Sequence, residues 1–134
     1  MNNAPSIRFQ MPARIVVVYD EPACLDEAVS ALSLAGHDPV GFTDTMAALR
    51  ALDTPQQVSL LITRMRFPPG RPQGISLARV LKTKRPELKI LFTAQPELAE
   101  HAEGIGEFLA LPVSMTALVA TVDRILRSCA GAPS

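Results

Sequence analysis

The sequence predicts an α/β fold in which helices cover both faces of a parallel β-sheet. Three runs are apolar almost throughout, as in strands that are buried on both faces: RIVVVY at 14–19, VSLLIT at 58–63 and LKILFT at 88–93. Between these runs, apolar residues recur at three- and four-residue spacing, which is the pattern of a helix with one buried face. Proline or glycine stands at most of the junctions, where the chain has to turn.

Two strand–helix units occupy the first half of the chain. Pro22 follows the first strand and favours the first turn of a helix, which we expect to stop at Gly36. A short strand at 40–42 comes next, and Thr43 or Asp44 can cap the helix after it. The apolar faces of these helices are Leu25, Ala28, Val29, Leu32 and Ala35, and then Met46, Ala47, Leu49 and Leu52.

The second half continues the alternation. The strand at 58–63 leads into residues 64–74, whose three prolines and two glycines exclude regular structure there. A helix follows and ends at Pro86, before the strand at 88–93. A weak polar helix from Pro96, a short strand at 107–109 and a last helix complete the chain. The apolar positions of the two stronger helices are Ile75, Ala78 and Leu81, and Met115, Leu118, Val119, Val122 and Leu126.

Five strands that alternate with five helices favour a flavodoxin-like three-layer sandwich. Right-handed crossovers and the size of the chain favour a five-stranded parallel sheet of order 2-1-3-4-5. With 134 residues the chain suits one domain, and we place it at 14–128, between an N-terminal tail, 1–13, and a loose C-terminal tail, 129–134.

Composition excludes several classes of function. Thirteen basic residues balance thirteen acidic ones, so no global field favours nucleic acid or an anionic membrane surface. The chain lacks tryptophan and is only 4% aromatic, which argues against stacking platforms for single-stranded nucleic acid. No segment predicts a signal peptide or a membrane span, so we expect a cytoplasmic protein. Cys24 and Cys129 lack metal-type spacing and are expected to be small buried side chains in helices.

Chemistry in an open parallel sheet is expected at the carboxyl ends of its strands. These ends carry Tyr19-Asp20, Thr63-Arg64, Thr93-Ala94 and Leu111-Pro112. The sequence has no glycine-rich phosphate loop, and Gly104-Ile-Gly106 precedes a strand, which is the wrong order for dinucleotide binding.

The same four segments resemble the receiver domain of response regulators, over residues 14–128. VVVYDEP at 16–22 resembles the receiver opening, in which paired acidic residues follow the first strand. LLITRMRFP at 60–68 resembles the segment around the phosphate-accepting aspartate, and LFTA at 91–94 resembles the fourth strand with its hydroxyl residue. FLALPV at 108–113 resembles the fifth-strand signature.

The resemblance implies a reaction whose essential groups are mostly missing from this chain. A receiver aspartate takes a phosphoryl group from a histidine kinase, with a divalent metal on the acidic pair and a lysine beside the phosphate. In this chain, Arg64 replaces the phosphate-accepting aspartate, Tyr19 replaces one of the paired acidic residues and Leu111 replaces the lysine. Only Asp20 and Thr93 match the residues that receivers have at these positions. Arginine offers no nucleophile and would repel a divalent ion by roughly 8 kcal/mol at about 4 Å and an effective dielectric near 20. We therefore expect no catalytic residue, no metal and no cofactor.

We interpret the chain as a pseudo-receiver in two-component (phosphorelay) signal transduction that acts by phosphorylation-independent protein interaction and is not an enzyme. The resemblance implies a protein partner, a histidine kinase or another signalling protein, or a homodimer through the fourth helix, fifth strand and fifth helix. One alternative is a small-ligand or nucleotide/flavin-binding flavodoxin-like domain. Another is an adaptor that titrates a histidine kinase without accepting phosphate.

Finer expectations concern single residues at these strand ends. Arg64 is expected to pair with Asp20 in place of the metal, the alternative being that it turns into solvent with Arg66. The three arginines Arg64, Arg66 and Arg71 form a basic cluster that is either a solvated loop or a contact for an acidic partner.

The remaining candidates belong to the fifth strand and to the first turn region. Receivers carry at the position of Phe108 an aromatic that reports activation, and we expect a core or interface role for it here. The resemblance also implies a cis peptide bond between Leu111 and Pro112. His37 lies in a turn and shows no catalytic partner in the sequence.

Overall fold

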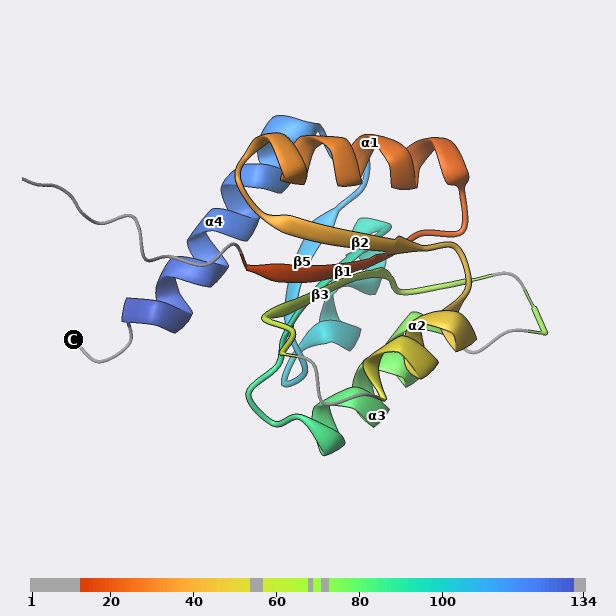
Figure 1. Ribbon diagram of the computed structural model, residues 1–134. Coiled ribbons are helices and arrows are strands. Elements are labelled where there is room, and N and C mark those ends of the chain that lie inside the picture. Colours follow the sequence, from red (N-terminus) through yellow and green to blue (C-terminus); the bar gives the residue numbers. More distant parts are fainter. Residues whose placement is uncertain (1–12, 54–56, 68, 71–72, 132–134) are drawn as a thin grey trace, which may run out of the picture.

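Five parallel strands form one sheet, with helices on both of its faces (Figure 1). The computed structural model describes residues 13–53, 57–67, 69–70 and 73–131. The strands are β1 (Arg14–Val18), β2 (Asp38–Phe42), β3 (Leu60–Arg64), β4 (Lys89–Ala94) and β5 (Glu107–Ala110). Their order is β2-β1-β3-β4-β5, which confirms the predicted flavodoxin-like topology.

Helices α1 (Pro22–Leu34) and α4 (Met115–Gly131) cover one face, and α2 (Thr45–Leu52) and α3 (Gly74–Lys84) cover the other (Figure 1). Because side chains alternate along a strand, Ile15 and Val17 pack toward α1 and α4, and Val16 and Val18 toward α2 and α3. The sheet therefore separates two apolar cores. α4 ends at Gly131 and so extends into the stretch 129–134 that was expected to be a loose tail.

The fourth helical segment differs from its expected form. It begins at Pro96, as predicted, but it is η2 (Pro96–Ala102), a 3₁₀-helix of seven residues. Only Ala102 of this segment is buried, and Leu98 is half-buried against the core. Its polar residues leave too few apolar contacts to hold a longer helix on the sheet.

The predicted helix boundaries follow from local chemistry. Pro22 occupies the first turn of α1, and Gly36 adopts φ of 95° just after that helix ends. Asp44 caps α2 by accepting a hydrogen bond from the backbone N–H of Ala47, at 3.1 Å. Two positions of the predicted faces are wrong: Ala35 lies beyond the end of α1, and Met46 is exposed in the first turn of α2.

Gly74 lets the start of α3 pack against the end of β3. A Cβ atom at this position would lie 1.7 Å from the carbonyl oxygen of Arg64, a backbone atom that cannot turn aside. The sequence interpretation placed both residues in the irregular stretch 64–74, but Arg64 is the last residue of β3 and Gly74 is the first residue of α3. This contact fixes the position of Arg64 relative to α3.

We therefore expect Gly74→Ala to lower the free energy of unfolding by at least about 1–3 kcal/mol, because the added methyl group displaces backbone. In an unobstructed helix the same change would raise stability by roughly 1 kcal/mol. Urea unfolding of the variant measures the difference, with Ser76→Ala, at an exposed position in the same first turn of α3, as the control. A variant as stable as the original protein would contradict the contact.

Candidate functional site

The register of the sheet brings the predicted site residues to one edge. Arg64 and Thr93 are partners across β3 and β4, and Thr63, just before Arg64, is the partner of Val18 at the end of β1. Tyr19 follows Val18 directly, and Leu111 donates its backbone N–H to the carbonyl of Ala94, at 2.9 Å. The carboxyl ends of β1, β3, β4 and β5 thus meet as the sequence predicted.

The guanidinium of Arg64 lies over the ring of Tyr19, with Cζ 5.5 Å from the ring centroid. The expected ion pair with Asp20 is wrong, since the two residues share no hydrogen bond or ion pair in the described part of the chain. The alternative, in which Arg64 turns into solvent, is also wrong because its Nε is buried. In the sequence, Tyr19 was notable only because it stands where receivers have an acidic residue. In the structure, the face of its aromatic ring attracts the cation of Arg64.

This packing leaves two polar atoms without partners on paired strands. Arg64 Nε and Thr93 Oγ1 are both buried, and neither has a hydrogen-bond partner among the described residues. An orphaned buried group costs about 1–3 kcal/mol, and a desolvated cation–π contact returns up to about 2 kcal/mol. The stacking therefore offsets much of the cost of burying Arg64 Nε, and Arg64 contributes little net stability.

Burial raises the pKa of Tyr19, whose side chain is almost completely enclosed. The nearby Thr93 hydroxyl and the positive charge of Arg64 act in the opposite direction by favouring the phenolate, and burial prevails. Thr93 lies close to the phenol but not with hydrogen-bond geometry, because its Oγ1 is unsatisfied. Tyr19 is therefore a neutral residue at neutral pH.

Asp20 is half-buried in the loop after β1, with neither a cation nor a capping role in the described structure. The N-cap of α1 is the next residue, Glu21, whose side chain accepts a hydrogen bond from the thiol of Cys24 at 3.3 Å. That hydrogen bond, with a smaller effect of burial, raises the pKa of the thiol. Cys24, which was expected to be buried, is only half-buried, and the Cys129 side chain lies outside the described part.

The fifth-strand residues take the expected backbone geometry. The peptide bond between Leu111 and Pro112 is cis, as the sequence interpretation predicted. Phe108 packs against the core under α2 and α3, Leu109 packs against the opposite core, and Leu111 is half-buried. The side chains of Phe108 and Leu109 are therefore turned toward the two cores.

Two interactions near the strand ends had no signal in the sequence. Gln73 closes the loop after β3: its Oε1 accepts from Phe67 N at 2.7 Å, and its Nε2 donates to Phe67 O at 3.0 Å. His37 Nε2 lies 2.8 Å from Asp123 Oδ1 and joins the turn after α1 to α4. Only the fold brings these residues together, because no spacing rule connects them. Arg71, the third arginine of the predicted basic cluster, lies outside the described residues.

The residues at the strand ends do not fit a divalent metal. One carboxylate, Asp20, stands beside a buried neutral phenol and a permanent cation. Within the described ranges no three His, Cys, Asp or Glu side chains gather where a metal ion could be held. No described helix is long and apolar enough to span a membrane.

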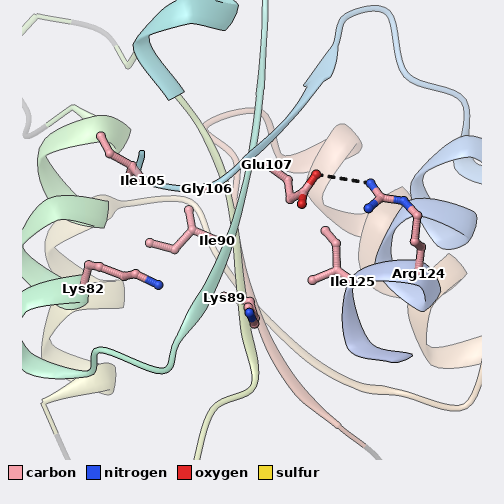
Figure 2. Close-up of a pocket in the computed structure, with 8 residues that line it drawn as sticks. All are labelled: Lys82, Lys89, Ile90, Ile105, Gly106, Glu107, Arg124 and Ile125. Carbon is pink, nitrogen blue, oxygen red and sulfur yellow. Dashed lines mark hydrogen bonds and ion pairs between the residues drawn. The ribbon is translucent and has the colours of Figure 1, made fainter. Parts of the chain in front are cut away.

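Two cavities lie away from the contact between Tyr19 and Arg64. One, of about 170 Å³, lies near the amino ends of β4 and β5, between α3 and α4 (Figure 2). The other, of about 360 Å³, lies between the loop after β3, α3 and η2. Its lining is Met65, Arg66, Gln73, Ile75, Arg79, Leu98 and His101.

Comparison with known proteins identifies the fold. No protein-family model and no curated protein matches the sequence. A response regulator receiver domain protein from Clostridium thermocellum is 23% identical, with a TM-score of 0.76 over 86% of this chain and 94% of that one. A receiver protein from Sinorhizobium medicae is 22% identical, with a TM-score of 0.78 over 88% and 97%. A CheY-like receiver from Methanospirillum hungatei is 19% identical, with a TM-score of 0.80 over 90% and 98%. The chain therefore has the fold of response-regulator receiver domains.

The stacking of Arg64 on Tyr19 predicts how this tyrosine titrates. Tyr19 is the one tyrosine and the chain has no tryptophan, so the ultraviolet absorbance of tyrosinate reports this residue alone. Arg64→Met keeps an apolar stem and removes the charge that favours the phenolate, so the pKa of Tyr19 should rise further. The exposed neighbour provides the control, Arg66→Met. An unchanged Tyr19 pKa in Arg64→Met would show that the guanidinium does not lie over the ring.

Proposed function

We propose that this chain is a pseudo-receiver: a receiver-like domain of two-component signalling that accepts no phosphoryl group and acts by binding protein. The observation that carries the proposal is Arg64 at the carboxyl end of β3, with its guanidinium over the ring of Tyr19. Aspartyl phosphorylation needs a carboxylate nucleophile and a divalent ion to neutralise the charge of the phosphoryl group. A buried neutral phenol and a cation supply neither.

The composition of the site also argues against enzymatic activity there. Leu111 places an aliphatic side chain where receivers have a lysine, so no cation would pair with a phosphate on that side. Thr93 is completely buried, and its hydroxyl has no room to contact a ligand without a local rearrangement. The groups that remain have structural roles, and any signal would have to pass through the surface.

The partner we propose is another protein, either a signalling protein such as a histidine kinase or a second copy of this chain. For self-association the favoured face is η2, β5 and α4. β5 is an edge strand, so one side of its backbone is free to pair with another strand. Phe108 and Leu109 are turned inward and form no apolar patch on this face. The proposed self-association therefore rests on the free backbone edge of β5.

Incubation with acetyl phosphate and magnesium tests the loss of phosphorylation. The intact mass of the protein should not change, since Arg64 offers no carboxylate. The matched control is the triple variant Tyr19→Asp, Arg64→Asp, Leu111→Lys, which restores the receiver groups on the same fold. It should gain one phosphoryl group that hydroxylamine removes. Phosphorylation of the original protein would refute the proposal, and a folded triple variant that stays unmodified would refute the assignment of these positions.

Sedimentation over a range of concentrations tests the self-association face. We expect a dimer that Ala110→Lys abolishes, because the exposed new charge stands on the edge of β5. Ser33→Lys, on the exposed side of α1, should leave the dimer intact. A strict monomer at high concentration, or a dimer unaffected by Ala110→Lys, would contradict this choice of face.

A further inference from the structure

The larger cavity combines an apolar floor with a cationic rim. Its apolar lining is Met65, which is buried, and Ile75 and Leu98, which are half-buried. Three exposed side chains of the lining are basic or can become so: Arg66, Arg79 and His101. None of the described residues that line it is acidic.

The cavity follows from the short form of η2. A 3₁₀-helix is narrow, and this one contributes only Leu98 and Ala102 to the core beside α3. Two turns of helix therefore cover less of this face than α2 and α3 do. The space that remains lies between α3 and η2, next to the residues that follow β3.

The rim cations of the larger cavity form no side-chain hydrogen bond or ion pair in the described structure, in contrast to two of the three cations that line the smaller cavity. Figure 2 shows Arg124 pointing toward Glu107, with which it forms an ion pair of 3.3 Å. Lys82, which also lines the smaller cavity, donates a hydrogen bond from Nζ to the carbonyl oxygen of Leu88, at 2.8 Å. At the larger cavity, no side-chain hydrogen bond or ion pair in the described structure engages the guanidinium of Arg66 or Arg79, or the ring of His101. Charges without partners around a cavity favour an anionic occupant.

The beginning of α3 adds to this positive field. Gln73 and Ile75, the N-cap residue and a residue of the first turn, both line the cavity. A helix of 11 residues has a partial positive charge at its N-terminus, and the side chain of its N-cap residue, Gln73, forms no capping hydrogen bond. The helix end and the two arginines therefore act in the same direction.

We propose that this cavity binds a small amphipathic organic anion, with a flat or branched apolar body on Met65, Ile75 and Leu98. A carboxylate or phosphate group on that body would pair with Arg66 and Arg79, since guanidinium groups bind such oxygens in bidentate fashion. The volume, about 360 Å³, falls in the range of roughly 300–1,000 Å³ that small-molecule sites occupy. This site is separate from the contact between Tyr19 and Arg64 and does not depend on protein binding by the domain.

The distribution of apolar surface favours a small ligand over a protein segment. The large apolar side chains that are exposed in the described part are Leu34, Met46 and Val80, and none of them lines the cavity. A protein partner would need apolar surface that continues around the opening. Here the apolar atoms are confined to the floor, where an occupant of limited size can cover them.

Nuclear magnetic resonance titration with 2-naphthoate, and with its neutral counterpart 2-naphthamide, tests the proposal on the full chain. The naphthoate should shift the methyl signals of Ile75 and Leu98 and the ring signals of His101, with saturation at one equivalent. The naphthamide should bind at least about tenfold more weakly, because it lacks the charge that the arginines complement. Arg66→Met and Arg79→Met should each weaken the binding of the naphthoate by a similar factor and leave the affinity for the naphthamide unchanged.

Arg127→Met is the matched control, since Arg127 is an exposed arginine of α4 that lines neither cavity. Equal binding of the two probes, or naphthoate binding that survives both cavity substitutions, would overturn the proposal. A third arm uses a peptide of alternating leucine and glutamate. If the peptide shifts these signals and the naphthoate does not, the occupant is a protein segment and the proposal of a small ligand is wrong.

Discussion

The contact between Arg64 and Tyr19 determines what the carboxyl edge of this sheet can do. It depends on the parallel register of β1 and β3, which sets Thr63 beside Val18 and so brings the next residue of each strand together. It depends also on Gly74, because any larger residue would displace the backbone of Arg64. Once these neighbours are fixed, a guanidinium stands 5.5 Å from a buried aromatic ring. The positive charge of the edge is then permanent, since arginine does not deprotonate in proteins.

A permanent cation means that the charge at this edge of the sheet does not vary as it does in receivers. In receivers the charge there changes when a phosphoryl group arrives, and the fold responds to that change. Here the charge of Arg64 is constant, and the Thr93 hydroxyl beside it is buried with no hydrogen-bond partner among the described residues. The peptide bond before Pro112 is cis and Phe108 packs inward, so the fifth-strand segment has the backbone geometry that the resemblance to receivers implied. The proposed function follows from a receiver fold that lacks the side chains needed for aspartyl phosphorylation.

Local sequence signals predicted the fold well because each of them has a local cause. Buried runs specified the strands, Asp44 specified the cap of α2, and the spacing of apolar residues specified the faces of α1 and α4. The partner of Arg64 was missed because the sequence interpretation matched opposite charges and did not extend the alternation of side chains past the strand ends. That alternation places Tyr19, two residues after Val17, on the same face as Arg64, two residues after Ile62. The bond between His37 and Asp123 and the loop closure by Gln73 join residues without any shared pattern, so only the folded chain shows them. The 3₁₀ form of η2 was missed for another reason: a weakly apolar segment is compatible with either helix type.

The central claim is that this edge binds no divalent ion because Arg64 already carries the positive charge there. Paramagnetic broadening of backbone amide signals by Mn²⁺ tests it most directly, with the exposed carboxylates Glu97 and Glu100 on η2 as an internal reference. We expect the amide signals of Tyr19, Asp20 and Arg64 to broaden no more than those of the two reference residues. Selective broadening of these three signals at low Mn²⁺ would show that the edge holds a metal despite its arginine and would contradict the account.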